Sequence, residues 1–373
     1  MIGILTFHWA DDYGAMLQAY ALKTCLEGLA KESVEVIPYA PVKLTGRYWM
    51  IPIVGIERGR KIIYFPGVFG IVRNVSHLRA YLRRRKNMRG FRRLYLTREA
   101  KIRKADRLSL KKYSCVFVGS DQVWNPEITI GLDDAYMGNI KDRESCRLAA
   151  YAASFGKASL PVKYHAAFEK AVNENFFGVS MREKNAAPFV EKFYHGKVTD
   201  VLDPTLLLNP REWRRIAKQP EQKNYILFIC TEYNRRMVKY LQELSAELKK
   251  KVVQVSMPWP GQRKDWINLQ IEGGPSEFIG FFQNADFIVT NSFHGTVFSV
   301  LMEKQFLVFG HSNRNARIEN LMEKLDLKPR LVESGRMPEK EEILQEIDWG
   351  HVRELVEQER GASIEYIKSM LVV

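Results

Sequence analysis

Residues Asn291, Ser292, His294 and Gly295 form the group in this sequence that is best suited to chemistry. An apolar run typical of a buried strand precedes them at residues 286–290, and an apolar helical pattern follows them. A turn that begins a helix offers backbone N–H groups and the positive end of the helix dipole. The imidazole adds a donor that can also carry a proton near neutral pH. This spacing predicts a site for an anion, either a phosphate, a carboxylate or both.

Arg182 and Asp203 also follow apolar strands, at residues 177–180 and 198–202. An arginine at the end of a parallel strand can bind phosphate or carboxylate through its planar fork of donors. The alternative is an exposed ion pair with the neighbouring Glu183. Asp203 precedes a proline and could act as a base, but the pattern favours a structural role in capping this segment. Both questions stay open on spacing alone.

Asp121, Gln122 and Asn125 lie in a polar loop after the apolar strand at residues 115–118. Their side chains are suited to hydrogen bonding with sugar hydroxyls, and Trp124 between them could provide a stacking face. A turn built around a buried tryptophan is the alternative. The clustering of polar residues favours a binding loop.

Gly14 lies at the start of a helical pattern that follows the first strand, and Gln18 comes one turn later. A glycine at a helix start favours an anion or a ligand rich in hydroxyls. The segment is neither a GxGxxG motif nor a Walker motif with its lysine, so it predicts neither a dinucleotide nor ATP. Gln18 could face a ligand or be an ordinary helix residue.

Two further arginines, Arg314 and Arg317, precede or open a helix after the strand at residues 306–309. They could add positive charge beside His294, or they could form a solvated helix face. Spacing does not decide between these alternatives.

The elements that must position these residues alternate between strand and helix along the whole chain. Such alternation predicts parallel sheets with helices on both faces. Asp203-Pro204 breaks the pattern. We therefore predict an α/β fold with two Rossmann-like domains facing a cleft, at residues 1–203 and 204–348, followed by a C-terminal helix at 349–373. Ligands should bind at the carboxyl ends of the strands. The expected strands are 2–7, 34–38, 115–118, 147–152, 177–180, 198–202, 225–230, 252–256, 287–290 and 306–309, and the expected helices are 15–29, 162–175, 184–193, 235–248, 276–283, 296–303, 316–325 and 349–370.

The chain has 373 residues and a net charge of +14, and the positive charge is concentrated in one segment. Residues 43–112 contain 21 Lys/Arg and 3 Asp/Glu, whereas the remainder contains 36 basic and 40 acidic residues. This basic insertion also contains aromatic clusters, such as Tyr64-Phe65. The combination is typical of contact with an anionic membrane surface. Nucleic acid and a solvated insertion are the alternatives, and we predict the membrane as partner and not nucleic acid.

The four cysteines are scattered, without a CxxC pair. This predicts a reduced, cytoplasmic environment and no structural zinc. We expect neither a metal nor a cofactor, because no cluster with ligand spacing occurs.

Six motifs in this order resemble those of the polysaccharide pyruvyl transferase family. They are residues 13–22 (YGAMLQAYAL), 118–125 (VGSDQVWN), 151–156 (YAASFG), 180–183 (SMRE), 203–206 (DPTL) and 285–295 (ADFIVTNSFHG), and residues 317–322 are also of the family type. The basic insertion lies outside the matched motifs.

The resemblance implies a glycosyltransferase-B-like pair of domains and transfer of the pyruvyl group of phosphoenolpyruvate onto two hydroxyls of a sugar. The product would be a pyruvate ketal in a cell-surface polysaccharide or its lipid-linked precursor, with release of phosphate. Carried over by motif, Arg182 and His294 are donor-site residues, and the loops around Gly14 and Asp121 face the acceptor. Either Asp121 or Asp203 would be the general base. The expected location is the cytoplasm, peripheral at the inner face of the membrane.

Two other functions remain open at this point. One is a nucleotide-sugar-dependent glycosyltransferase of the same fold, since a fold does not determine a function. The other is a non-catalytic protein that binds glycans or membranes.

Overall fold

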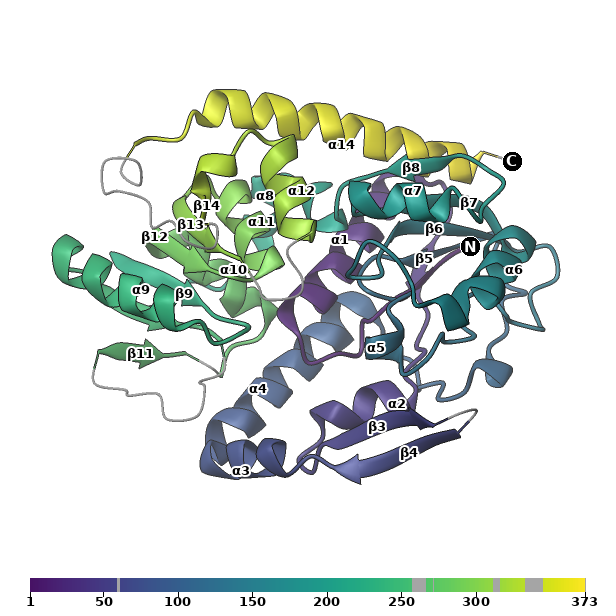
Figure 1. The fold of residues 1–373 in the computed structure, drawn as a ribbon, viewed down its shortest axis with the longest axis horizontal. Coiled ribbons are helices and arrows are strands. Elements are labelled where there is room, and N and C mark those ends of the chain that lie inside the picture. The colour runs from purple at the N-terminus through teal and green to yellow at the C-terminus, as the bar shows by residue number, and fades with distance from the viewer. Residues whose placement is uncertain (59–60, 257–265, 271, 311–315, 333–344, 373) are drawn as a thin grey trace. The chain divides into compact units, whose positions relative to one another are not determined.

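The computed structural model describes residues 1–58, 61–256, 266–270, 272–310, 316–332 and 345–372. The chain divides into two compact units (Figure 1). Unit 1 comprises Met1–Leu78, Arg89–Leu208 and Gln358–Val373, and unit 2 comprises Arg79–Met88 and Asn209–Glu357. The sequence-based division at residue 203 placed residues 79–88 in the first domain and treated the C-terminal helix as a separate piece, whereas here that helix belongs partly to each unit.

Unit 1 is built on a sheet of six parallel strands in the order β2-β1-β5-β6-β7-β8. Their bounds are β1 Ile2–Leu5, β2 Val34–Val36, β5 Cys115–Gly119, β6 Arg147–Ala153, β7 Phe176–Met181 and β8 Val198–Asp200. The strand order reverses at β1, which pairs with β2 on one side and β5 on the other. In open parallel sheets, ligands bind at the carboxyl ends of the strands beside such a reversal.

Helices cover this sheet and bury almost all of its side chains. They are α1 Tyr13–Leu29, α2 Val42–Thr45, α5 Pro126–Thr129, α6 His165–Asn175, α7 Ala187–Val190 and the second part of α14 Trp349–Leu371. On α6, the side chains of Phe168 and Val172 pack in one cluster with Val118 and Ala150 of the strands. The amino end of α1 is capped by Asp12, whose carboxylate accepts from the N–H of Ala15.

Unit 2 has its own six-stranded parallel sheet, in the order β11-β10-β9-β12-β13-β14. The bounds are β9 Tyr225–Ile229, β10 Lys251–Gln254, β11 Ile267–Leu269, β12 Ala285–Thr290, β13 Gln305–Phe309 and β14 Leu331–Val332. This is the strand order of a Rossmann sheet, with its reversal between β9 and β12. The loops after these two strands are therefore the expected position of a ligand.

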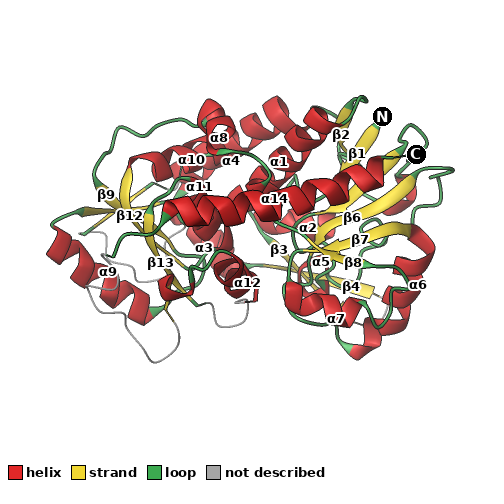
Figure 2. Ribbon diagram, turned by 90° about the horizontal axis from the view of Figure 1, so that it is seen from above, coloured by secondary structure: helices red, strands yellow, loops and turns green. Residues whose placement is uncertain are grey.

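Helices lie on both faces of the unit 2 sheet (Figure 2). They are α8 Pro210–Ile216, α9 Arg235–Leu248, α10 Pro275–Asn284, α11 Phe293–Leu301 and α12 Ala316–Lys324. Met237 and Leu241 of α9 pack with Phe228 and Val289 of the strands. On the other side, Phe298 of α11 packs edge-on against the rings of Trp213 and Phe278. Successive side chains of one strand point to opposite faces of the sheet, so both faces can pack against helices.

The basic insertion folds into two defined pieces. A hairpin is formed by β3 Ile53–Arg58 and β4 Lys61–Pro66, and it is followed by α3 Val68–Ser76 and α4 Leu78–Phe91. The helix α4 is divided between the units. Its residues 79–88 belong to unit 2, and its two ends belong to unit 1. Within the described residues, no helix is both long enough and apolar enough to cross a membrane.

The prediction of two Rossmann-like domains with parallel sheets is confirmed. The cleft between them stays a prediction. The helix expected at 184–193 is too long, because only a 3-10 turn at Lys184–Ala186 and the four-residue α7 form there. Pro188 lies in the first turn of α7, where its missing N–H and fixed φ are tolerated, so the α-helix begins at Ala187 and not at Lys184.

Candidate functional site

The turn after β12 is held to the neighbouring strand by Asn291. Its side-chain oxygen accepts from the N–H of Thr231 over 2.8 Å, and its amide nitrogen donates to the carbonyl of Glu232 over 2.6 Å. Thr231 and Glu232 follow β9, the strand on the other side of the reversal. Asn291, predicted as a binding residue, therefore joins the two strand ends and sets the shape of the site.

Ser292 and Gly295 build the helix start that follows. The hydroxyl of Ser292 caps α11 by accepting from the N–H of Gly295 over 3.3 Å. A β-carbon on Gly295 would lie 2.3 Å from Oγ1 of Thr290. Oγ1 of Thr290 is held in that position by two hydrogen bonds, since it accepts from the N–H of Ser292 and donates to the carbonyl of Ile229. Gly295 is therefore required for the close approach of helix and strand.

His294 lies in the first turn of α11 and is buried. Its ring centre is 5.2 Å from that of Phe293 in an edge-on arrangement. The guanidinium carbon of Arg317, on the first turn of α12, lies 5.3 Å from the centre of the same Phe293 ring. The guanidinium of Arg317 and the imidazole of His294 therefore both lie against the same Phe293 ring. Arg314 lies outside the described residues.

Arg182 lies at the carboxyl end of β7 among three carboxylates of unit 1. Its Nη1 lies 2.8 Å from Oδ2 of Asp203, its Nε 3.7 Å from Oε1 of Glu183 and its Nη2 3.9 Å from Oδ1 of Asp121. The exposed fraction of the side chain is 2% for Arg182, 0% for Asp203 and 15% for Asp121. Burial alone would lower the pKa of Arg182, but Glu183, Asp203 and Asp121 outweigh this and hold it above its usual range.

Asp203 is fully occupied by neighbours of its own unit. One of its carboxylate oxygens accepts from the backbone N–H and the hydroxyl of Thr205, and the other accepts from Arg182 and from Ser120. The first pair caps the 3-10 turn at Pro204–Leu206. This arrangement is the structural role that the sequence pattern favours.

The loop after β5 places Asp121 at its most accessible point. Asp121 has a φ of 64°, and its carboxylate accepts from the N–H of Gln122 over 2.8 Å. Tyr48 is close by, and burial followed by the charges of Asp12 and Asp121 raises the pKa of its hydroxyl. Among the carboxylates around Arg182, Asp121 is the one best placed to meet a ligand.

Gln122 and Asn125 brace the same loop from within. The Asn125 amide donates to Oε1 of Gln122 over 2.7 Å, and its oxygen caps α5 by accepting from the N–H of Glu127. A β-carbon on Gly156 would lie 2.0 Å from Oε1 of Gln122. Gly156 also has a φ of 70°, so a larger residue there would be strained as well. These contacts fix two strand ends against each other.

The expectation of Trp124 as an exposed stacking face is wrong. Its side chain is fully buried, its ring packs on Phe155, Phe168 and Phe176, and its Nε1 donates to the carbonyl of Tyr136. The apolar area of the indole outweighs the polarity of its sequence neighbours, and the ring turns into the core. Gln122 and Asn125 are buried as well, so within residues 119–125 only Asp121 is partly exposed.

Gly14 and Gln18 are buried in the first turns of α1. The Gln18 amide donates to the hydroxyl of Thr6 over 2.9 Å and to the carbonyl of Ala15 over 2.8 Å. Gln18 therefore links α1 to the loop after β1. The Gln18 side chain is buried and supports that loop through these hydrogen bonds.

Sequence reasoning missed His8, which lies in that loop, three residues after the end of β1. His8 is buried, and its Nδ1 lies 3.1 Å from the carbonyl of Thr6. Burial, and secondarily the charge of Arg92, lowers its pKa from 6.5 to about 3. Because a carbonyl can only accept, Nδ1 of this neutral ring carries the proton. The position of His8 in the sequence could have identified it as a candidate. It is a titratable residue near the carboxyl end of the strand at which the sheet order reverses.

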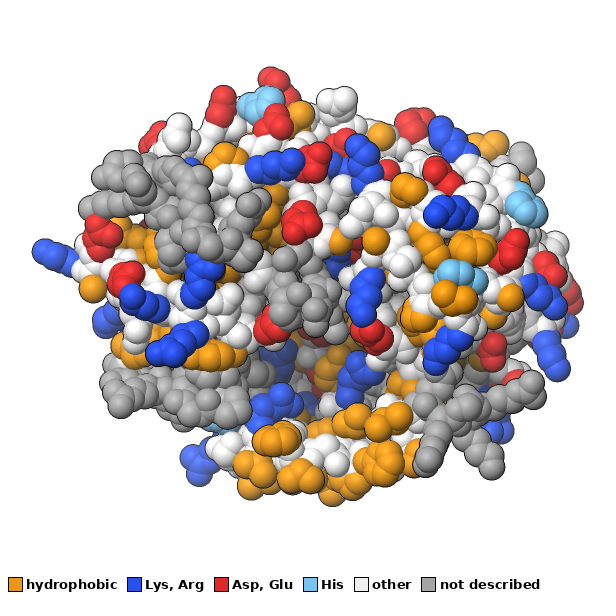
Figure 3. Space-filling view, viewed as in Figure 1, with side chains coloured by type: hydrophobic (Ala, Val, Ile, Leu, Met, Phe, Trp, Pro, Cys, Tyr) orange, Lys and Arg blue, Asp and Glu red, His pale blue; other side chains and the backbone are white. Residues whose placement is uncertain are grey.

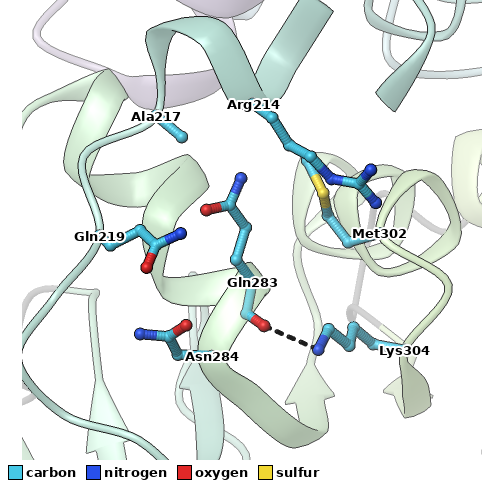
Figure 4. Close-up of a pocket in the computed structure, with 7 residues that line it drawn as sticks. All are labelled: Arg214, Ala217, Gln219, Gln283, Asn284, Met302 and Lys304. Atoms are coloured by element: carbon cyan, nitrogen blue, oxygen red, sulfur yellow. Dashed lines mark hydrogen bonds between the residues drawn. The ribbon is translucent and has the colours of Figure 1, made fainter. Parts of the chain in front are cut away.

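A pocket of about 290 Å³ opens elsewhere in unit 2 (Figure 4). It is lined by Arg214, Ala217, Gln219, Gln283, Asn284, Met302 and Lys304. Asn284 and Lys304 directly precede β12 and β13, so the pocket lies at the amino ends of these strands. The ammonium of Lys304 donates to the carbonyl of Gln283, and burial lowers its pKa. Because His294 follows the carboxyl end of β12, this pocket is separate from the candidate site.

The predicted residues therefore form two groups, one in each unit. Unit 1 brings together Asp121, Gln122, Asn125, Arg182 and Asp203, and unit 2 brings together Asn291, Ser292, His294, Gly295 and Arg317. Gly14 and Gln18 lie in unit 1 on α1, which follows the adjacent strand β1. Both groups lie at carboxyl ends of strands, as predicted.

Comparison with known proteins gives a family. The sequence profile described as polysaccharide pyruvyl transferase matches residues 12–313. Comparison with curated proteins gives no match. Among solved structures, the Methanocaldococcus jannaschii UDP-GlcNAc 2-epimerase is similar with a TM-score of 0.49 and 11% identity, covering 99% of this chain and 98% of that one. The Rickettsia bellii UDP-N-acetylglucosamine 2-epimerase gives a TM-score of 0.48 and 11% identity, covering 99% and 95%. The Acinetobacter baumannii MurG gives 0.41 and 11%, covering 99% and 98%.

Proposed function

This chain belongs to the polysaccharide pyruvyl transferase family, and from that membership we propose that it transfers the pyruvyl group of phosphoenolpyruvate onto two hydroxyls of one sugar. The sugar belongs to a cell-surface polysaccharide or its precursor, and the products are a pyruvate ketal and phosphate. The observation that carries the proposal is the family match, which spans both the Arg182 group and the His294 turn. Neither group alone would identify this donor.

The chemistry requires no further reactant. A proton adds to the C3 methylene of phosphoenolpyruvate and leaves C2 electrophilic. One sugar hydroxyl attacks C2 and loses its proton, and the C2–O bond to phosphate breaks with the electron pair leaving on phosphate. A second hydroxyl of the same sugar then attacks C2, loses its proton and closes the ketal. The enzyme must hold two anionic groups, supply one proton and accept protons from the hydroxyls.

Unit 2 supplies the donor-binding residues in this proposal. The helix start at Ser292–Gly295 favours a phosphate or carboxylate through the dipole of α11. Arg317 adds positive charge next to the Phe293–His294 pair. His294 either donates to the phosphate or delivers the proton to C3. Asn291 keeps the turn in place through its bonds to the loop after β9.

Unit 1 supplies the acceptor-binding residues. We assign the general base to Asp121 over Asp203, because Asp203 has a fully buried side chain and is bonded to Thr205, Ser120 and Arg182, whereas Asp121 reaches solvent. The guanidinium of Arg182 forms ion pairs with carboxylates of its own unit. We therefore propose that Arg182 orients Asp121 and Asp203 and does not bind the donor directly. The loop of Gln122 and Asn125 holds this group in shape.

The acceptor is a saccharide, either free or linked to a lipid on the cytoplasmic side of the membrane. A lipid-linked acceptor would place the enzyme at the membrane surface, for which residues 43–112 are the candidate segment. Phosphoenolpyruvate and this acceptor are the proposed partners.

Thermal unfolding with candidate donors tests the proposal. A ligand that binds the native state raises the melting temperature, and at a concentration of about a hundred times Kd it adds about 2.7 kcal/mol. We expect phosphoenolpyruvate to raise the melting temperature of the full chain, and UDP- and GDP-sugars to leave it unchanged. A response to a nucleotide sugar alone would instead favour a glycosyltransferase.

A further inference from the structure

A surface helix usually turns its apolar side chains toward the core. In α3, several apolar side chains face the solvent instead. Val68, Phe69, Val72 and Val75 are 60% to 90% exposed, while Asn74 is 2% exposed. The inward side carries Gly70 and Asn74, with Ile71 half-buried beside them. The Asn74 amide donates to the carbonyls of Trp49 and Met50, and a β-carbon on Gly70 would lie 2.6 Å from Cγ of Pro52. The helix is thus anchored through Asn74 and Gly70, while its most exposed side chains are apolar.

The hairpin continues this apolar surface. Val54 is opposite Phe65 and Ile56 is opposite Ile63, so all four side chains lie on the same face of the hairpin, and all are exposed. The opposite face packs inward at Gly55, where a β-carbon would lie 2.6 Å from the side chain of Ile130, while Tyr64 on that face is 45% exposed. A β-carbon on Gly67, just before α3, would touch Val54. The hairpin face and the helix face therefore join.

Figure 3 shows hydrophobic side chains gathered over β3, β4 and α3. Among the described residues, most of the exposed large hydrophobic side chains lie between Ile51 and Leu94. Scattered exposed side chains are normal, but a continuous apolar patch marks a surface that is covered in function. We call this patch the apolar face. It consists of Val54, Ile56, Ile63, Phe65, Val68, Phe69, Val72 and Val75.

The charge of the chain next to the apolar face indicates what covers it. Residues 61–98 contain 11 Lys/Arg and no Asp/Glu. Arg73 lies on α3 itself, and α4 begins two residues after α3 ends and carries Arg79 and the run 83–86. Cations beside aliphatic and phenyl side chains match a bilayer with anionic headgroups, which binds both kinds of group. Nucleic acid would bind the cations but would gain nothing from exposed valine and isoleucine.

We propose that the apolar face inserts into the interfacial layer of a lipid bilayer that carries anionic lipid, with the basic residues of α3 and α4 binding the headgroups. The protein would then lie on the membrane without crossing it. This inference does not depend on the proposed reaction, because the residues that carry it belong to neither residue group of the candidate site.

Vesicle flotation of the full chain tests it. The probes are vesicles of phosphatidylcholine alone and of phosphatidylcholine with phosphatidylglycerol. The variant carries Val68→Ser, Phe69→Ser and Val72→Ser. The matched control is Val162→Ser, a valine of unit 1 that is 79% exposed outside the patch. All four side chains are exposed, so circular dichroism and the melting temperature should be unchanged in both variants.

We expect the wild-type chain and Val162→Ser to float with phosphatidylglycerol vesicles, and less well with phosphatidylcholine alone. The triple variant should bind roughly a hundredfold more weakly or worse, because three inserted apolar side chains are lost. Any one of three results would overturn the proposal. The wild-type chain could fail to float. The triple variant could bind as well as wild type, with binding abolished only by salt. The wild-type chain could instead form a dimer without lipid that the triple variant does not form, which would make a second copy the occupant.

Discussion

The Nη1 atom of Arg182 lies 2.8 Å from Oδ2 of Asp203, and both side chains are buried in unit 1. This pair ties the carboxyl end of β7 to the segment that follows β8. Glu183 and Asp121 lie within 4 Å of the same guanidinium. One cation therefore serves three carboxylates, so its removal leaves several buried charges without compensation.

Arg182→Gln should lower the free energy of unfolding by roughly 3–5 kcal/mol, because breaking a buried pair strands its partners. Urea unfolding followed by circular dichroism measures this. The control is Arg353→Gln, which removes an exposed pair with Glu303 and should have no measurable effect. Equal unfolding midpoints for both variants would show that Arg182 does not hold the carboxylates together.

His8 should make the protein sensitive to mild acid. Its pKa is 6.5 in the unfolded chain and about 3 in the folded one. Between these values the unfolded state binds one proton more, so stability falls as pH falls, by about 1.4 kcal/mol per pH unit at most. His8→Asn keeps a donor for the Thr6 carbonyl but cannot titrate. Urea unfolding at a series of pH values should therefore show a steeper loss below about pH 6.5 in wild type than in the variant. Parallel curves would contradict a buried neutral His8.

Asp121→Asn should lower kcat by roughly 10²–10⁴-fold with little change in stability, because it removes the proposed base from the acceptor loop. Asp134→Asn is the matched control, since that carboxylate is exposed and belongs to neither residue group. Initial rates of phosphate release, together with melting temperatures, separate the two effects. A normal kcat in Asp121→Asn would return the role of base to another group.

His294→Ala should lower kcat/KM without unfolding the chain. The expected decrease corresponds to a loss of roughly 2–4 kcal/mol of transition-state stabilisation. His351→Ala is a suitable control, because that histidine is exposed and pairs with Asp326. Single-turnover rates with phosphoenolpyruvate measure the difference. Turnover near that of wild type would remove His294 from the mechanism.

Much of the architecture was predictable because strand and helix patterns depend on local periodicity. The apolar runs ending at Thr290 and Val118 predicted buried parallel strands, and both are central strands of their sheets. The polar residues that follow each run necessarily lie at one edge of a sheet. For this reason the candidate residues lie at strand ends, but Arg182, predicted beside His294 in the donor site, lies with Asp121 in unit 1.

The surroundings of individual side chains were not predictable in the same way. The guanidinium of Arg182 forms ion pairs with Asp203 and Asp121, which are 21 and 61 positions away in the chain, so local spacing could not reveal these partners. Trp124 has polar sequence neighbours but packs on Phe168, 44 positions away. In α3, periodicity indicates one apolar face but not whether that face meets the core or the solvent.

Mass spectrometry of the glycan product tests the central claim most directly. The chain is incubated with phosphoenolpyruvate and a panel of free and lipid-linked glycans, and in parallel with UDP- and GDP-sugars. Pyruvyl transfer predicts a product heavier than its acceptor by one pyruvic acid minus one water, with one phosphate released for each product formed. A product that gains the mass of a sugar residue from a nucleotide sugar, with phosphoenolpyruvate left unconsumed across the panel, would contradict it.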